Sequence, residues 1–290
     1  MSIKSPPVLM LGAGLALAGA LSLGAVPTPV VAQQTAAGNM DTAPVPTGPP
    51  TTLATPSEVD AGVAEADELF RAHRVDESLA LLDDVLALEP EHHGALVAAA
   101  RSAIAKGLLS EGTDVQNEWY RTAEATALRA VEMVPEGLAG LDWLMTAKGL
   151  RAVQSGSTDA ATLGDEVFDL AHQILAADSL HPGATHALGV LNYEVRKLPR
   201  IKRFFAEHFL GADVMGLTSW EDAERYLTRA VELRPEYILY HLDLGLLYLN
   251  HNRKEEARVH FERALELPVF EPPDSKFQAA AELRCEETFN

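Results

Sequence analysis

The side chains that could do chemistry are ten histidines, 42 carboxylates and one cysteine, and their spacing matches no catalytic pattern. The chain contains no HExxH, CxxC or GxSxG motif and no glycine-rich phosphate loop. No base can be assigned to the single cysteine, Cys285, so it is not expected to act as a nucleophile. His241, His251 and His260 fall in three different predicted elements. We therefore expect no catalytic residue, no metal ligand set, no cofactor and no enzymatic activity.

The other notable histidines stand near turns. His92 and His93 follow Pro90, and a metal bound there would need further ligands that cannot be assigned. His181 directly precedes Pro182, which is typical of the start of a helix. These positions favour packing or turn-forming roles, and only His186 is placed where it could line a groove.

The bulk composition excludes one large class of partners. The chain has 290 residues and a formal net charge of −19, whereas nucleic-acid binding needs a basic surface. The length allows a full hydrophobic core in one large domain or two small ones. We therefore expect a protein that does not bind nucleic acid.

The N-terminal residues have the order of an export signal. Lys4 is followed by an apolar run over residues 8–26 and then by the small-residue sequence Val30-Val31-Ala32. We interpret residues 1–32 as a signal peptide, although an uncleaved membrane anchor is the alternative. Residues 33–57 are rich in proline and threonine and read as a disordered linker. The protein is expected to be exported, and to be periplasmic, secreted or anchored to a membrane.

Residues 58–290 consist of repeated helical segments. Four segments of apolar helical periodicity each close at a proline, and a fifth nearly repeats them over residues 262–268. No alternating strand pattern interrupts them. The prolines are Pro90, Pro135, Pro182 and Pro235. The pattern predicts an all-α chain built from about five two-helix units.

Small residues at fixed positions identify the kind of repeat. In the last unit, Leu244-Gly245 and Tyr248 lie on the first predicted helix, and Ala257, Phe261 and Ala264 lie on the second. This spacing resembles the tetratricopeptide repeat, which implies a helical-hairpin solenoid. Residues 108–116, 154–159 and 197–217 are expected to be insertions within units two, three and four. The C-terminal segment from residue 275 is expected to form a capping helix.

A narrower resemblance covers the C-terminal half. The order of residues 181–268 is HPGATHALGVLNYEV, a basic and aromatic insertion, SWEDAERYLTRAVELRPEYILYHLDLGLLYL and a final ALELP. This order is similar to the regulator of microtubule dynamics family, in which an N-terminal membrane segment and a linker precede a helical repeat domain. In animal members the resemblance implies organelle tethering, microtubule association and, in some, lipid binding. An exported chain would meet no microtubule, so we carry over only the fold and the groove.

The first helices of stacked units line a concave groove. The segment from Tyr237 to Leu249 is apolar nearly all round, so we expect it to be buried on both sides. The groove positions that we expect to bind are Leu239, Leu242, Leu246 and Leu249 in unit five and His186, Val190 and Tyr193 in unit four. Either the protein's own insertion or final helix fills this groove, or a peptide, helix or acyl chain does.

The insertion in unit four is locally basic in an acidic protein. It combines cationic and aromatic side chains, namely Lys197, Arg200, Lys202, Arg203, Phe204 and Phe205. Such a segment can contact an anionic membrane surface or an acidic partner. Alternatively, its aromatic rings pack inward and its cations pair with carboxylates of the array.

These observations predict a non-catalytic binding module or scaffold of the cell envelope that engages a protein partner through the groove. The alternative is a binder or carrier of a lipid-like apolar ligand in the same groove.

Overall fold

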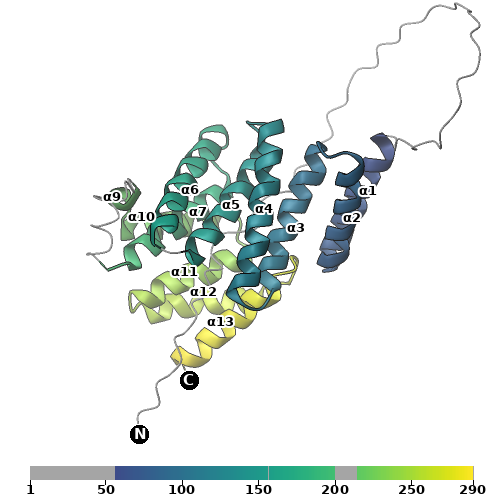
Figure 1. Cartoon of the computed structure of the whole chain (residues 1–290). Coiled ribbons are helices and arrows are strands. Elements are labelled where there is room, and N and C mark those ends of the chain that lie inside the picture. Colours follow the sequence, from purple (N-terminus) through teal and green to yellow (C-terminus); the bar gives the residue numbers. More distant parts are fainter. Residues whose placement is uncertain (1–55, 156, 200–213, 290) are drawn as a thin grey trace, which may run out of the picture.

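The computed structural model describes residues 56–155, 157–199 and 214–289, and every regular element in that part of the chain is a helix (Figure 1). The helices pack as pairs, and in every pair except α7 with α10 the two helices are consecutive in the chain. The pairs are α1 (Pro56–Arg71) with α2 (Val75–Leu88), α3 (His93–Leu109) with α4 (Thr113–Met133), α5 (Leu138–Gln154) with α6 (Ser157–Ala177), α7 (Pro182–Lys197) with α10 (Trp220–Leu233), and α11 (Ile238–Asn250) with α12 (Lys254–Glu266). The predicted five two-helix units are therefore confirmed.

Two further helices complete the described part of the chain. The short α9 (Val214–Leu217) precedes α10, and α13 (Asp274–Phe289) packs against α11 and α12. Phe277 and Ala281 of α13 are fully buried. Because α13 covers the apolar face of the last unit as the next first helix would, the prediction of a C-terminal capping helix is confirmed.

Two of the predicted insertions are wrong. The helix α3 continues to Leu109 and α4 begins at Thr113, so most of residues 108–116 is helical, and α5 and α6 likewise extend into residues 154–159. The units are long because their second helices are long: α4 and α6 have 21 residues each. The polar residues that suggested a loop are exposed positions on a helix, for example Asp114 in the first turn of α4. Residues 200–213 of the third insertion lie outside the described residues.

Glycine and alanine allow the two helices of a unit to approach closely. A Cβ atom on Gly245 of α11 would lie 2.5 Å from the ring of Phe261 on α12, and one on Gly189 of α7 would lie 2.8 Å from the side chain of Leu227 on α10. Ala257 and Ala264 of α12 are fully buried. The small residues are therefore required by the distance between the helices, as the repeat pattern predicted.

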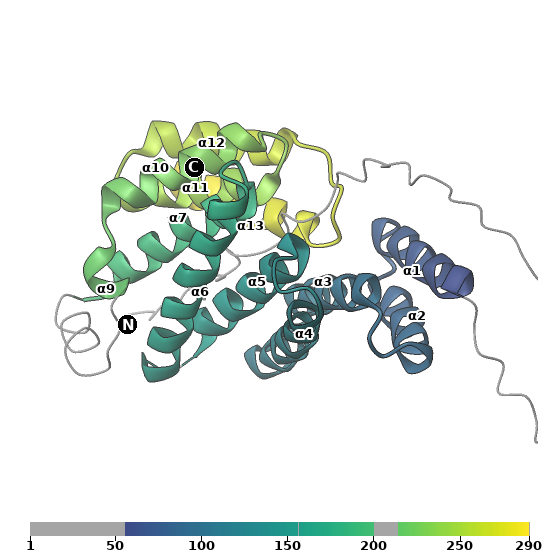
Figure 2. The ribbon, with the colours of Figure 1, turned by 90° about the horizontal axis from the view of Figure 1, so that it is seen from above.

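The units follow one another along a curved path, and the C-terminal segment returns towards the first units on the inner side of the curve (Figure 2). Two contacts confirm that return. The His73 ring, in the turn after α1, lies 3.3 Å from the carbonyl oxygen of Phe270, and Lys276 Nζ donates a hydrogen bond of 2.6 Å to the Leu108 carbonyl oxygen.

Within the three described ranges, no helix combines the length and the apolar character needed to cross a bilayer. The predicted signal peptide or anchor (residues 1–32) and the linker (residues 33–57, apart from the start of α1) lie outside these ranges.

Candidate functional site

The first helices of the units carry the predicted groove positions on one face, which we call the inner face. Polar pairs join neighbouring first helices across it. Arg101 on α3 donates a hydrogen bond of 2.5 Å to Asp67 on α1, and His186 on α7 lies 2.8 Å from Asp243 on α11. The inner face is thus continuous from the first unit to the last, although its exposure changes along the array.

The four leucines of α11 are covered to different extents. Leu239 and Leu242 are 0% and 3% exposed, whereas Leu246 and Leu249 are half-buried against the same core. The expectation that α11 is buried on both sides therefore holds for its first two turns. The side chains that cover it belong to the protein itself, since α7, α10, α12 and α13 all pack against α11.

The unit-four positions are buried too. His186, Val190 and Tyr193 are 2%, 4% and 7% exposed. The His186 ring stacks on Tyr240 at a centroid distance of 4.4 Å, and Tyr193 meets the edge of Trp220 at 5.9 Å. These three predicted site residues belong to the same core cluster as the leucines of α11, and their side chains pack against other residues of the protein.

An aspartate lies buried at the centre of the inner face. Asp142 on α5 is 1% exposed, and neither carboxylate oxygen has a hydrogen-bond partner among the described residues. Its Oδ1 atom lies 4.0 Å from Nδ1 of His181, which caps α7 by accepting a hydrogen bond from the Ala184 N–H. Burial raises the pKa of Asp142 to about 6, and the positive charges of His181, Arg234 and His186 oppose that rise.

Tyr240 of α11 lies near this aspartate, and Tyr237, at the N-cap of α11, packs against Tyr240. Tyr237 and Tyr240 are 3% and 1% exposed, and their rings meet edge to face at 4.6 Å. The Tyr240 hydroxyl has no hydrogen-bond partner within the described part of the chain. Burial raises the pKa of both tyrosines well above the usual value, so both stay neutral. We call Asp142, His181, His186, Tyr240 and Asp243 the buried polar centre.

Among the residues that the structure describes, no three histidine, cysteine or acidic side chains are placed to hold a metal ion. Cys285 is half-buried on α13, and burial raises the pKa of its thiol, which disfavours the reactive thiolate. The centre can bind or release a proton at Asp142, and nothing in it forms a nucleophile–base pair.

His92, His241 and His260 make contacts within and between helices. His92 accepts a hydrogen bond of 3.1 Å from the Ala95 N–H and so caps α3, as its place after Pro90 suggested. His241 and His260 lie 3.1 Å apart between α11 and α12. Burial and the neighbouring His241 lower the pKa of His260 to about 4, so this pair is neutral at physiological pH.

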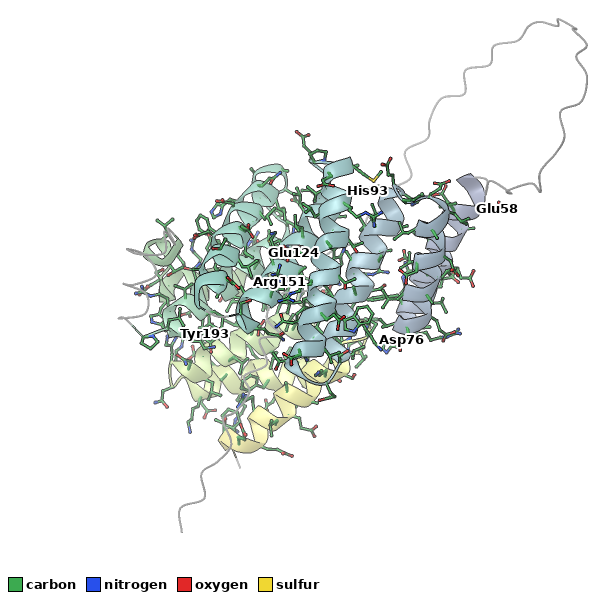
Figure 3. The ribbon with its side chains drawn as sticks, viewed as in Figure 1. Glu58, Asp76, His93, Glu124, Arg151 and Tyr193 are labelled. Atoms are coloured by element: carbon green, nitrogen blue, oxygen red, sulfur yellow. The ribbon has the colours of Figure 1, made fainter. Side chains whose placement is uncertain are left out.

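A second polar cluster joins three helices of the middle units. Lys148 on α5 donates to Glu124 on α4 at 3.0 Å and to Glu166 on α6 at 2.8 Å, and Arg151 also pairs with Glu124. Figure 3 shows Glu124 and Arg151 side by side in the middle of the array. Because every member has an opposite charge as its partner, this cluster holds neighbouring units together.

The segment between α12 and α13 is the element of the inner face that the sequence did not reveal. We call residues 267–273 the strap. Asp274, just after it, accepts hydrogen bonds from the Phe270 and Glu271 N–H groups at 2.9 and 2.8 Å. The strap reaches unit one, almost 200 positions earlier in the chain, through the His73–Phe270 contact. No local periodicity encodes such a contact, although the Glu271-Pro272-Pro273-Asp274 run marks a break between helices.

Of the six cationic and aromatic residues named in the insertion, the structure describes Lys197. Lys197 forms an ion pair of 2.7 Å with Glu194 and lies over the Tyr193 ring at 4.7 Å. Arg200, Lys202, Arg203, Phe204 and Phe205 lie outside the described residues.

Comparisons with known proteins agree with this architecture. The family model described as regulator of microtubule dynamics protein 1-3 matches residues 63–287. The crystal structure of TTC0263, a thermophilic TPR protein from Thermus thermophilus, superposes with a TM-score of 0.53 at 19% identity, covering 78% of this chain and 99% of that one. This likeness shows the tetratricopeptide fold.

A curated relative matches a shorter stretch. The protein O-mannosyl-transferase Tmtc2 of Drosophila melanogaster is 44% identical over 57 residues, which is 19% of this chain and 6% of the relative. Because the match spans so little of the relative's length, it carries no inference about activity.

Proposed function

The chain belongs to the regulator of microtubule dynamics protein 1-3 family, and we propose that it is a non-catalytic binding module that holds a segment of a protein partner on its inner face. A tetratricopeptide-like array is a fold of protein-interaction scaffolds, in which the concave surface offers an extended contact area.

The observation that carries this proposal is the difference in exposure along the inner face. The groove positions of unit four are largely buried, as are Leu239 and Leu242 of unit five. On the first helices of units one and two, Val63, Asp67 and Val97 are partly exposed, and the Arg101 side chain is 12% exposed. These residues combine apolar side chains with charges of both signs. A mixed, accessible surface of this kind suits a polypeptide segment better than an acyl chain.

We also propose that the protein acts in the cell envelope. The order of Lys4, the apolar run over residues 8–26 and the small-residue sequence before residue 33 supports export. The insertion that begins at Lys197 would then be available to an anionic membrane surface, through the cationic and aromatic residues of its sequence.

Val97→Glu is expected to abolish partner binding while the array stays folded, because it replaces a partly exposed apolar side chain of the inner face by a carboxylate. The measurement is quantitative capture of proteins from a cell-envelope extract on wild-type and variant protein. Val259→Glu is the matched control, since Val259 is 63% exposed on α12 and away from the inner face. If both variants capture the same proteins as the wild type, the inner face is not the binding surface.

A lipid-like ligand is the weaker alternative, because Leu239 and Leu242 are already covered by the protein itself. Native mass spectrometry of the protein after exposure to a lipid extract is therefore expected to show the polypeptide mass alone. A bound acyl species that disappears in Leu246→Asp, with the variant still folded, would overturn this expectation. Leu246 is suitable because it is half-buried at the rim of the apolar cluster.

A further inference from the structure

The second helices of the first three units end along one edge of the array. Figure 3 shows Asp76, at the start of α2, towards the lower edge and His93, at the start of α3, towards the upper edge. α4 and α6 lie alongside α2 and end at the same upper edge (Figure 1). The Arg129 guanidinium on α4 donates a hydrogen bond of 2.5 Å to the Pro90 carbonyl oxygen, so units one and two touch there. We call residues 88–91, 132–136 and 178–181 the turn edge.

Apolar side chains are exposed at the same place in each of these three turns. The residues two positions before the unit-ending prolines are Leu88, Met133 and Leu180, which are 60%, 39% and 57% exposed. Val134, beside Met133, is 41% exposed. We call these four residues the apolar row. Aliphatic side chains gain free energy when they leave water, and their recurrence at one position in three consecutive units is typical of a surface that another molecule covers.

The apolar row lies among carboxylates. Each of the first two turns has an acidic residue on either side of its proline, and these are Glu89, Glu91, Glu132 and Glu136. No lysine, arginine or histidine of the described ranges forms an ion pair with any of the four. The helix dipoles add to this negative field, since α2, α4 and α6 have no basic residue in their last turns. The turn edge is therefore both apolar and negatively charged.

The fourth unit shows how the same kind of turn can be neutralised. There Glu232 and Glu236 pair with Arg229 and Arg234 at 2.9 and 3.5 Å. The apolar residue two positions before the proline, Leu233, is half-buried. Carboxylates without a cation at the C-termini of helices lower helix stability, so folding alone does not explain them in units one and two.

We propose that the turn edge is a second interaction surface, separate from the inner face, and that it binds a basic amphipathic segment of a protein partner. Lysine and arginine fit such a surface, because their aliphatic stems can cover the apolar row while their charged ends reach the neighbouring carboxylates. An anionic membrane or a second copy of the same edge would be repelled, since like charges that are brought together cost free energy. This inference goes beyond the function proposed for the inner face and does not depend on it.

The test uses the full chain and a fluorescent helical peptide of leucine and lysine, with one apolar and one basic face, measured by fluorescence polarisation. The double variant Leu88→Ser, Leu180→Ser is expected to bind this peptide at least about tenfold more weakly than wild type does, because it removes the two most exposed members of the apolar row. Val259→Ser, Leu283→Ser is the matched control, since these side chains on α12 and α13 are 63% and 48% exposed. The control is expected to bind as wild type does.

A second pair of variants tests the carboxylates separately from the overall charge of the protein. Glu132→Gln, Glu136→Gln is expected to weaken peptide binding at least about tenfold and to reduce its dependence on salt. Asp169→Asn, Glu282→Gln changes the net charge by the same amount at exposed positions of α6 and α13, and is expected to bind as wild type does. Circular dichroism and thermal unfolding show that each variant is folded.

The proposal is overturned if the apolar variant and its control bind the peptide equally, or if a peptide with glutamate in place of lysine binds as tightly. It is also overturned if Val97→Glu abolishes peptide binding, because the peptide would then lie on the inner face. Failure of the proposed function is a separate outcome. If partner capture does not depend on Val97 but peptide binding still depends on Leu88 and Leu180, the inner face is not a binding surface and the turn edge is.

Discussion

Replacing Phe261 with alanine is expected to lower the free energy of unfolding by about 3–5 kcal/mol. Phe261 is fully buried on α12, and its ring lies against Gly245 of α11, where an added Cβ would be 2.5 Å away. The truncation leaves a cavity that the two closely packed helices cannot fill without moving. Since domains are stable by only about 5–15 kcal/mol, the C-terminal unit should lose much of its protection.

The measurement is urea unfolding together with hydrogen exchange on α11, α12 and α13. Repeat units contact mainly their neighbours, so the loss of protection should be largest in these three helices. Val259→Ala, on the same helix but 63% exposed, is the control and should change stability by less than about 0.5 kcal/mol. If both variants lost the same free energy of unfolding, the buried contact of Phe261 would not be what stabilises this unit.

A double-mutant cycle tests the pairing itself. Gly245→Ala alone is expected to cost about 1–3 kcal/mol, because its methyl group would overlap the Phe261 ring. In the double variant Gly245→Ala, Phe261→Ala the methyl group meets the cavity, so the combined loss should be smaller than the sum of the two. Strict additivity would contradict the packing described for this pair.

The units could be predicted from the sequence because their signals are local. Gly245 and Phe261 are sixteen positions apart in one unit, and the repeat spacing directly encodes their contact. Pro182 and Pro235 mark the turns between units for the same reason, because proline disrupts a helix interior. The loops within units two and three were harder to place. Their polar residues continue the helices, and in unit two Gly112, with its φ of +86°, marks the turn between α3 and α4.

The inner face could be predicted only in part. The predicted groove positions of unit five all lie on α11, but the extent of their burial depends on α13 and on neighbouring units. The strap contacts join residues up to 197 positions apart, and such contacts leave no periodic trace in the sequence. The burial of Asp142 likewise follows from the way α7 packs against both α5 and α11 in space.

The second prediction with a large effect concerns Asp142, and it is a dependence of stability on pH. Burial raises the pKa of Asp142 to about 6 in the folded protein, from an ordinary value near 3.8 in the unfolded chain. Between these two values the folded state binds more protons than the unfolded state does, so the free energy of unfolding falls as the pH rises. Above pH 6 the penalty is complete, and it amounts to about 3 kcal/mol.

Asp142→Asn is therefore expected to stabilise the protein relative to wild type by an amount that grows from small at pH 4 to about 3 kcal/mol at pH 7. An asparagine at this position would also lack hydrogen-bond partners, and this lowers the stability of the variant by the same amount at every pH. The part of the stability difference that changes with pH therefore reports the charge of Asp142 alone. The measurement is the urea midpoint of both proteins at several pH values across this range.

Asp169→Asn, at an exposed position of α6, is the control, and its stability should differ from that of wild type by the same amount at every pH. A difference for Asp142→Asn that is equally constant would mean that the buried carboxyl group is paired in solution. Its negative charge would then carry no net cost at neutral pH, and the buried polar centre would be a satisfied network.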